Sequence, residues 1–232
     1  MAPESTVLVL DDHALFAEAV TLALSTSGRS VHRVRLDPAG SSPSRLLASA
    51  LRIRPDIALL DLDLGEYGDG HELIQPLTRA GVDVIVVTGH TDEADWGGCL
   101  RLGARVVVAK HRALAELLAV VHRLEVGQPV LDPGEYHRLT SLWQDRLAED
   151  DDHRRRLARL TPREREVLGD LMAGRTIREI AGNDVVSEAT VRTQVRTILH
   201  KLGVSTQIAA VGMAHRLAWS APGGSRAARL SG

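Results

Sequence analysis

Five short apolar runs, each followed by a helical pattern, occupy the first 125 residues of the chain. The runs cover 6–10, 30–35, 56–60, 82–87 and 105–109. Apolar residues at helical spacing follow them at 14–24, 44–51, 71–79, 93–102 and 113–125. Strands that alternate with helices in this way build an open parallel sheet with helices on both faces. The sequence therefore predicts an α/β domain with a doubly wound sheet of five parallel strands.

Polar side chains follow four of these runs. Asp11 and Asp12 come after the first, Asp61 after the third, Thr88 after the fourth and Lys110 after the fifth. Ligands of open parallel sheets bind beyond the carboxyl ends of the strands, so we expect these side chains to converge. Three converging carboxylates repel one another and imply a cation, and oxygen ligands of this kind suit Mg²⁺.

The same side chains suit phosphoryl transfer. A carboxylate can attack a phosphoryl group and form an aspartyl phosphate. The transfer requires that a metal, a hydroxyl or amide and a cation neutralise the phosphoryl oxygens, and Thr88 and Lys110 supply the last two. Acids at strand ends are often only solvated loop residues. Five suitable side chains at the correct strand ends favour a functional site instead.

Four segments resemble the successive blocks of a bacterial two-component receiver domain. They read VLVLDDHALFAEAV, PDIALLDLDLG, DVIVVTGHTDE and GARVVVAKHRALAELLAVV, and the match covers about residues 5–126. The resemblance implies a sheet of flavodoxin-like order with Asp61 as the phosphoacceptor. It also implies that Asp12, with Asp11, holds Mg²⁺. Thr88 would be the switch hydroxyl and Lys110 the cation that binds the phosphoryl group.

Two positions depart from the receiver pattern. Leu64–Gly65 stands where a Met-Pro usually follows the acceptor, and the loop to Asp69–Gly70 is one residue longer. The aromatic residue usual three positions before the lysine is Val107. The residues for phosphorylation are all present, whereas the aromatic residue that usually couples to the switch hydroxyl is missing. Two hypotheses therefore stay open, a regulator driven by phosphorylation and an atypical regulator controlled by a ligand or partner.

An enzyme is the third hypothesis. Asp61–Leu62–Asp63 after an apolar strand resembles the DxD motif of haloacid dehalogenase-type phosphatases, which also use a later Thr and Lys. In that family the remaining acids follow the lysine, whereas here they precede the nucleophile. We therefore expect a regulator and not an enzyme, with Asp63 on the loop beside the acceptor.

The charge distribution predicts two domains with different partners. Residues 1–126 carry 12 basic and 17 acidic side chains, whereas residues 160–232 carry 10 basic and 6 acidic ones. Such asymmetry is typical of domains with different partners, and a basic domain is a hint of nucleic acid. We expect a receiver domain at 1–126, a linker with a helix at 127–159, a small domain at 160–218 and a disordered tail at 219–232.

The sequence of the small domain predicts a helix-turn-helix. Its helices are expected at 162–173, 176–182, 187–202 and 205–218, and Ser187 is a plausible N-cap of the third. Val191 and Val195 begin an apolar stripe on that helix, while basic and polar residues lie off the stripe. A helix with an apolar back and a basic front suits the major groove, where Arg reads guanine and Thr contacts thymine methyl groups.

The block from LTPRE to the end of the last helix resembles the LuxR-type (NarL/FixJ) DNA-binding domain. We expect the DNA contacts from Thr176, Ser187, Thr190, Arg192, Thr193, Arg196 and Lys201. Of these, Arg192, Thr193 and Arg196 match the family's DNA-reading positions, and Thr176 and Lys201 suit phosphate contacts. The resemblance implies dimerisation through Ile208, Ala209 and Val211. Asp184 departs from the pattern because that turn position is usually apolar.

The two resemblances together imply a response regulator of the NarL/FixJ class. Its expected partners are a sensor histidine kinase and double-stranded DNA at a promoter, bound as a homodimer, with RNA polymerase as a further candidate. The chain has no signal-peptide pattern and no run of about 18 apolar residues, so we expect a cytoplasmic protein without a membrane partner. A single cysteine, Cys99, excludes a disulfide scaffold.

Overall fold

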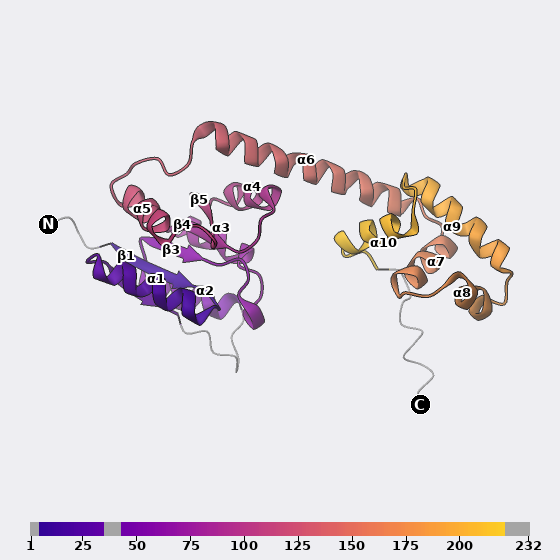
Figure 1. Cartoon of the computed structure of the whole chain (residues 1–232), viewed down its shortest axis with the longest axis horizontal. Helices are drawn as coiled ribbons and strands as arrows, with labels where there is room; N and C mark the ends of the chain where they lie inside the picture. Colours follow the sequence, from indigo (N-terminus) through magenta and orange to yellow (C-terminus); the bar gives the residue numbers. More distant parts are fainter. Residues whose placement is uncertain (1–4, 35–42, 221–232) are drawn as a thin grey trace, which may run out of the picture. The chain divides into compact units, whose positions relative to one another are not determined.

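A computed structural model describes residues 5–34 and 43–220 of the chain, which form two compact units. The first unit runs to Asp145 and the second starts at Arg146. The boundary lies within helix α6 (Pro133–Ala158), labelled in Figure 1. Residues 127–159, expected as a linker, thus contain a long helix whose two ends belong to different units. The helix expected within this linker is therefore present.

The first unit is built on a five-stranded parallel sheet. Its strands are β1 (Thr6–Leu10), β2 (Ser30–Arg33), β3 (Ile57–Leu60), β4 (Asp83–Thr88) and β5 (Val106–Ala109). Their order is β2-β1-β3-β4-β5, which confirms the predicted doubly wound sheet. Leu10 pairs with Leu60, and Thr88 pairs with Ala109. This register brings the carboxyl ends of β1, β3, β4 and β5 to one edge.

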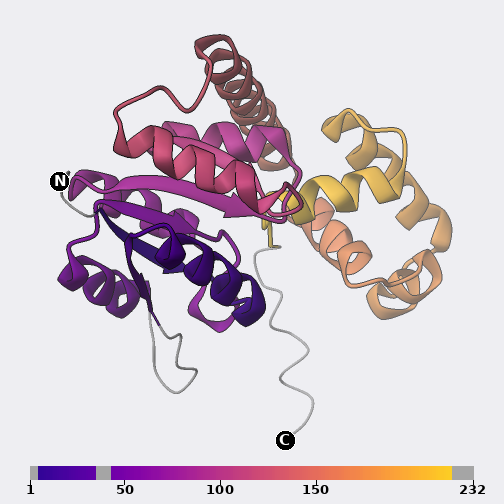
Figure 2. The same ribbon diagram turned by 60° about the vertical axis from the view of Figure 1, so that its left-hand side comes forward.

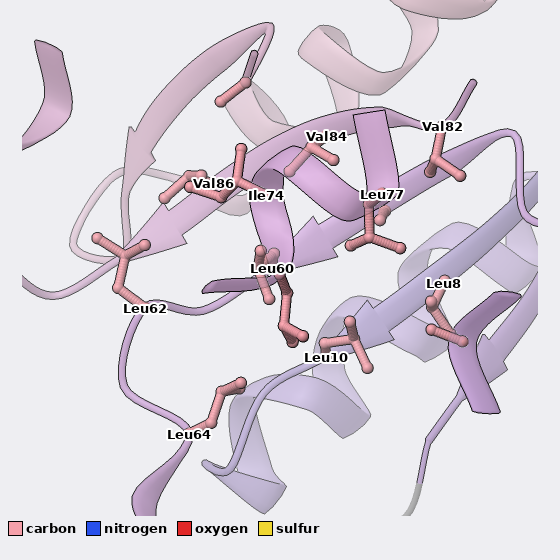
Figure 3. Close-up of a cluster of buried hydrophobic side chains, with 14 of the residues drawn as sticks. Leu8, Leu10, Leu60, Leu62, Leu64, Ile74, Leu77, Val82, Val84 and Val86 are labelled. Atoms are coloured by element: carbon pink, nitrogen blue, oxygen red, sulfur yellow. The ribbon is translucent and has the colours of Figure 1, made fainter. Parts of the chain in front are cut away.

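Helices cover both faces of the sheet, as Figures 1 and 2 show. They are α1 (Ala14–Thr26), α2 (Pro43–Ile53), α3 (His71–Arg79), α4 (Glu93–Arg101) and α5 (Leu114–Glu125), with a 3₁₀ turn at Gly65–Tyr67. Successive strand residues point to opposite faces, so Leu8 packs with α2 and α3 while Val9 packs with α1 and α5. Figure 3 shows the cluster around Leu8.

The second unit is all helical. It contains α7 (Pro162–Met172), α8 (Ile177–Asp184), α9 (Glu188–Leu202) and α10 (Gln207–Arg216) around one apolar core. Thr161 and Thr176 each form a capping box, with Glu164 and Glu179, which begins α7 and α8. Ser187 accepts a hydrogen bond from the Thr190 N–H and caps α9 as expected. These caps define the helix-turn-helix, and the predicted fold class is confirmed.

Two local expectations for this unit need correction. Asp184 is the last residue of α8 and not a turn residue, and its carboxylate forms an ion pair with Arg163 of α7. The pair ties α8 to α7 where an apolar side chain is usual. Trp219, placed at the start of the expected tail, packs on the core, and its N–H donates to the Ala214 carbonyl. The rest of that tail, from 221 to 232, lies outside the described residues.

In the part of the chain that the structure describes, no helix combines the length and the apolar character needed to cross a membrane.

Candidate functional site

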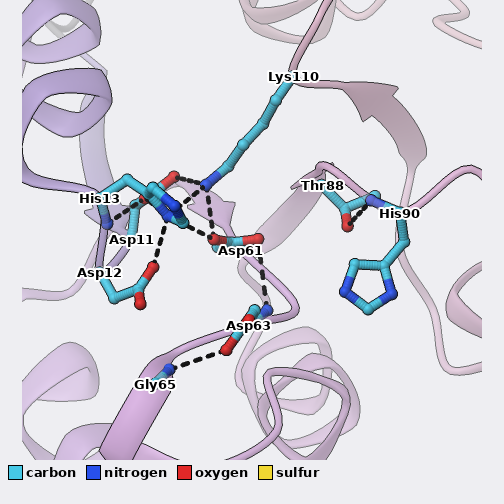
Figure 4. Close-up of polar contacts among 9 residues, drawn as sticks. All are labelled: Asp11, Asp12, His13, Asp61, Asp63, Gly65, Thr88, His90 and Lys110. Carbon is cyan, nitrogen blue, oxygen red and sulfur yellow. Dashed lines mark hydrogen bonds and ion pairs between the residues drawn. The ribbon is translucent and has the colours of Figure 1, made fainter.

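The predicted acidic edge of the sheet is assembled as expected (Figure 4). Asp11 and Asp61 follow β1 and β3 and are only 4% and 2% exposed. The ammonium group of Lys110, which follows β5, lies 2.6 Å from Asp61 Oδ2 and 2.8 Å from Asp11 Oδ2. The sheet register therefore brings residues that are far apart in the chain together in one compact charged site.

Burial and pairing act in opposite directions on these charges. Burial disfavours the ammonium form of Lys110, but hydrogen bonds to Asp11 and Asp61 outweigh that effect and raise its pKa. Burial raises the pKa of Asp61, against the hydrogen bond from Lys110, which lowers it. The Phe16 ring centroid lies 5.1 Å from the Lys110 nitrogen and adds a cation–π contact. Lys110 is thus a fixed cation beside the Asp61 carboxylate.

Asp12 extends the cluster toward solvent. It is exposed, and its Oδ1 lies 2.7 Å from Nδ1 of His13. One ligand atom from each of Asp11, Asp12, His13 and Asp61 lies within 4.8 Å of the others. Three carboxylates facing one ammonium group leave a negative cluster of hard oxygen donors. This donor set fits Mg²⁺, which prefers carboxylate oxygens and keeps several waters.

Thr88 completes the predicted set at the end of β4. It is fully buried, and its Oγ1 accepts a hydrogen bond of 3.0 Å from the His90 N–H. Figure 4 shows Thr88 on the side of Asp61 opposite His13. The position three residues before Lys110 holds Val107, which is half-buried against the apolar core. The hydroxyl is therefore hydrogen-bonded to the loop that follows β4.

The loop after Asp61 closes over the acceptor through its backbone. The Asp63 N–H donates to Asp61 Oδ1, and Asp63 Oδ1 accepts from the Gly65 N–H. Leu64, at the position of the usual Met, is buried in the core. Gly70 lies so near that a Cβ there would overlap the Asp61 carbonyl oxygen. The longer loop thus keeps the acceptor in place, and Asp63 lies on it.

A cavity that the sequence did not predict lies beside this loop. The cavity has a volume of about 500 Å³, and its lining includes Asp63 and His90. His71, also in its lining, has Nε2 3.1 Å from Asp95 and Nδ1 2.5 Å from Asp69. The hydrogen bond to Asp95, followed by one to Cys99, raises the pKa of His71 to about 11. His71 is therefore a charged link between α3 and α4, which no local sequence signal indicates.

The second predicted site lies on α9. Arg192, Thr193 and Arg196 are exposed, whereas Val191 and Val195 are buried in the core. The structure therefore separates the apolar back of α9 from its basic front. The other predicted contacts at its start, Ser187 and Thr190, are also exposed. Among these contacts the guanidinium of Arg192 forms a surface pair with Glu188, 3.1 Å away.

Two other predicted DNA contacts are engaged inside the domain. The Thr176 hydroxyl caps α8 and lies 2.8 Å from a carboxylate oxygen of Glu179. The Lys201 ammonium lies 2.8 Å and 2.7 Å from the two oxygens of Glu164, which is buried. This pair ties the end of α9 to α7. The phosphate contact expected from Lys201 stays a prediction, and the pair with Glu164 is what the structure shows for this side chain.

The predicted dimerisation residues lie on α10. Ile208 is 86% exposed, Ala209 is exposed and Val211 is half-buried. Ala210 and Met213, on the other side of α10, lie in the core. The helix therefore presents small and apolar side chains to solvent.

Two family models match this chain. Residues 7–122 match the response regulator receiver domain, and residues 158–214 match the bacterial regulatory proteins of the luxR family. The probable transcriptional regulatory protein NarL of Mycobacterium tuberculosis is 32% identical over 212 residues, which are 90% of this chain and 93% of that protein. The DNA-binding transcriptional activator DevR/DosR of the same organism is 28% identical over 222 residues, 94% of this chain and 97% of that protein.

A solved structure shares the fold. It is a two-component response regulator of the LuxR family from Aurantimonas sp. SI85-9A1, with a TM-score of 0.50 and 19% identity over 60% of this chain and 96% of that one. A receiver domain followed by a LuxR-type domain, in a chain that aligns with NarL over nearly its whole length, defines one architecture. The chain belongs to the NarL/FixJ family of response regulators, which are DNA-binding regulators of transcription.

Proposed function

We propose that Asp61 accepts a phosphoryl group from a sensor histidine kinase and that this modification controls DNA binding by α9. The observation that carries the proposal is the buried Asp61 carboxylate held by Lys110, 2.6 Å away, beside an exposed Asp12. The family supports a kinase as the donor, because its receiver domains are phosphorylated in two-component systems. A regulator that binds chromosomal DNA has to reach the chromosome, which supports a cytoplasmic location.

The transfer uses the chain's own groups in defined roles. A carboxylate oxygen of Asp61 attacks phosphorus, forming the O–P bond while the bond from phosphorus to the kinase histidine breaks. The electron pair of that bond stays on the histidine nitrogen. Lys110 and Thr88 bind phosphoryl oxygens and stabilise their negative charge. Asp11, Asp12 and Asp61 would hold Mg²⁺, which supplies further charge neutralisation.

DNA binding follows from the exposed front of α9. Arg192, Thr193 and Arg196 would read base edges, while Ser187 and Thr190 lie at the start of the helix, near the backbone. One small domain makes few contacts, so specific binding benefits from two copies. We assign α10, with Ile208, to the contact between them. RNA polymerase would then meet the bound dimer at the promoter.

The atypical regulator remains a second candidate, supported by Val107. Without an aromatic side chain at this position, Thr88 has no ring to couple with, so a ligand or partner could control the output. A phosphatase is less favoured, because the Asp63 carboxylate is already engaged within the loop. It accepts a hydrogen bond from the Gly65 N–H, while the Asp63 N–H donates to Asp61.

Fluorescence anisotropy with promoter DNA distinguishes these functions. We expect Mg²⁺ with beryllofluoride, a phosphoryl mimic, to raise affinity at least about tenfold, the size of a typical allosteric coupling. The Asp61→Asn variant should bind DNA but show no response. If the wild type and Asp61→Asn bind DNA with equal affinity, with and without beryllofluoride, the atypical regulator is favoured. Turnover of small phosphate esters would favour the phosphatase.

A further inference from the structure

The second half of helix α6 packs on the unit that carries α9. Leu157 of α6 is 1% exposed and belongs to the same apolar core as Ile198 of α9. Arg165 of α7 donates to the carbonyl oxygen of Ala158, at the end of α6, at 3.0 Å. Figure 1 shows this end of α6 beside α9 and α10. The DNA-binding unit therefore includes α6 from Arg146 onward.

Charged contacts fasten this half of α6 to α10 as well. The Arg216 guanidinium of α10 lies 3.3 Å from Glu149 and 3.4 Å from Asp150, both on α6. It also lies 2.7 Å from Nδ1 of His153. Because Arg216 is 41% exposed, each pair contributes little free energy by itself. The pairs instead orient α6, while its buried leucine supplies most of the stabilisation.

The last turn of α9 is closed by a side chain from α6. Helix α9 ends before Gly203, whose φ of +69° is typical of a helix C-terminus. Backbone N–H groups beyond the helix bind the carbonyl oxygens of Leu199 and His200. The carbonyl oxygen of Leu202 instead accepts a hydrogen bond of 3.0 Å from Arg156 Nη1 of α6. A cation at this end also faces the negative pole of the helix, so α6 supplies part of the C-terminal cap of α9.

Arg156 is held in this position from two sides. Its other terminal nitrogen, Nη2, lies 2.7 Å from Asp152, one turn earlier on α6. Gly203 leaves the space that the guanidinium occupies, because a Cβ there would overlap Arg156 Nη1. Arg156 also precedes the segment that matches the luxR family, which begins at residue 158. The cap therefore comes from the linker helix of this chain and not from the matched domain.

We propose that Arg156 is a positioning residue for DNA reading by α9. Leu202 lies about 9 Å from Arg196 along the axis of the helix, so a shift of the last turn is passed to the DNA-reading side chains. Hydrogen bonds to base edges need donor–acceptor distances of about 2.7–3.2 Å, whereas attraction to phosphates depends mainly on charge. Loss of the cap thus lowers sequence preference more than general affinity for DNA. This inference rests on the proposed DNA reading by α9.

Fluorescence anisotropy with the full chain measures this effect. The probes are a duplex that the wild type selects from a random-sequence pool and a scrambled duplex of the same composition. Arg156→Gln should lower the ratio of the two affinities about tenfold, the cost of one lost base contact. Arg155→Gln is the matched control, because Arg155 also pairs with an aspartate one turn earlier, Asp151. It removes the same charge and should leave the ratio within about twofold of the wild type.

A pair of glycine variants tests the contact from the side of α9. Gly203→Ala places a methyl group where Arg156 Nη1 lies and should lower the ratio as Arg156→Gln does. Gly174→Ala is its control, because Gly174 follows α7 with a similar positive φ but has open space around it. It carries the same backbone strain and should leave the ratio unchanged. Circular dichroism at the assay temperature confirms that each variant is folded.

The outcomes separate this inference from the proposed function. If Arg196→Ala loses the preference for the selected duplex while Arg156→Gln and Gly203→Ala keep it, Arg156 does not position α9. Equal losses in Arg156→Gln and Arg155→Gln would also overturn the inference, because they indicate an effect of charge alone. If Arg196→Ala keeps the preference, the proposed reading by α9 fails, and the inference falls with it.

Discussion

The two functional regions of this regulator, the acidic edge of the sheet and the exposed face of α9, differ in how far their charged side chains are buried and paired. At the sheet edge, Asp11 and Asp61 are buried, and the half-buried Lys110 places its ammonium group within 2.8 Å of both carboxylates. On α9, Arg192 and Arg196 are exposed on a helix whose apolar back fills the core. A site for covalent chemistry needs preorganised charges in a fixed geometry, because it stabilises one transition state. A DNA-reading surface instead needs guanidinium groups that are free to meet bases and phosphates.

Removal of Lys110 should have the largest effect. Lys110→Ala leaves the phosphoryl oxygens without their cation, so the rate of phosphorylation should fall about 10²- to 10³-fold, as for the loss of one oxyanion donor. Rapid-quench measurement with a small acyl phosphate checks this, with circular dichroism as the control for folding. Lys110→Arg keeps the charge but not the compact geometry and should recover only part of the rate. A rate in Lys110→Ala within about threefold of the wild type would contradict the preorganised edge.

Arginine removal on α9 tests the other half of the comparison. Arg192→Ala and Arg196→Ala should each weaken specific DNA binding by about 1–3 kcal/mol and leave phosphorylation unchanged. Arg155→Ala is the matched control, because the Arg155 and Arg192 side chains are both 63% exposed, each in an i,i+4 pair. Anisotropy titrations at one salt concentration measure the affinities. Equal losses in all three variants would indicate general electrostatics in place of base reading.

His71 sharpens the comparison, because its half-buried ion pairs should make the stability of the protein depend on pH. Its pKa is raised from 6.5 to about 11, chiefly by Asp95, with Cys99 and Asp69 also facing it. A raised pKa gives a contribution that is complete below pH 6.5 and is lost as the pH rises toward 11. His71→Gln should therefore cost about 1.5–3 kcal/mol at pH 6 and less at pH 9. Urea unfolding at the two values checks this, and a cost that grows with pH would refute the charged link.

The smallest effect is expected at Asp184. Its pair with Arg163 is partly exposed, so Asp184→Ala should change the free energy of unfolding by less than about 1 kcal/mol. Thermal unfolding of the wild type, Asp184→Ala and Arg163→Ala measures it. A loss of several kcal/mol in either variant would show that the pair replaces the usual apolar contact as an element of the core.

Sequence patterns predicted the parts of each region that depend on one element or on sheet topology. Asp61 and Lys110 follow strands and Thr88 ends one, and parallel strands bring such residues to one edge. The apolar stripe of α9 is likewise a local period. The contact of His71 with Asp95 and that of Lys201 with Glu164 depend on how helices pack, which no spacing indicates.

Intact mass spectrometry after incubation with Mg²⁺ and a small acyl phosphate tests the central claim most directly. The account predicts one added phosphoryl group in the wild type and none in Asp61→Asn, with both proteins folded and able to bind DNA. Fluorine NMR with beryllofluoride controls for a labile adduct. The same added mass in Asp61→Asn, or a wild type that takes up neither phosphoryl group nor beryllofluoride, would contradict it.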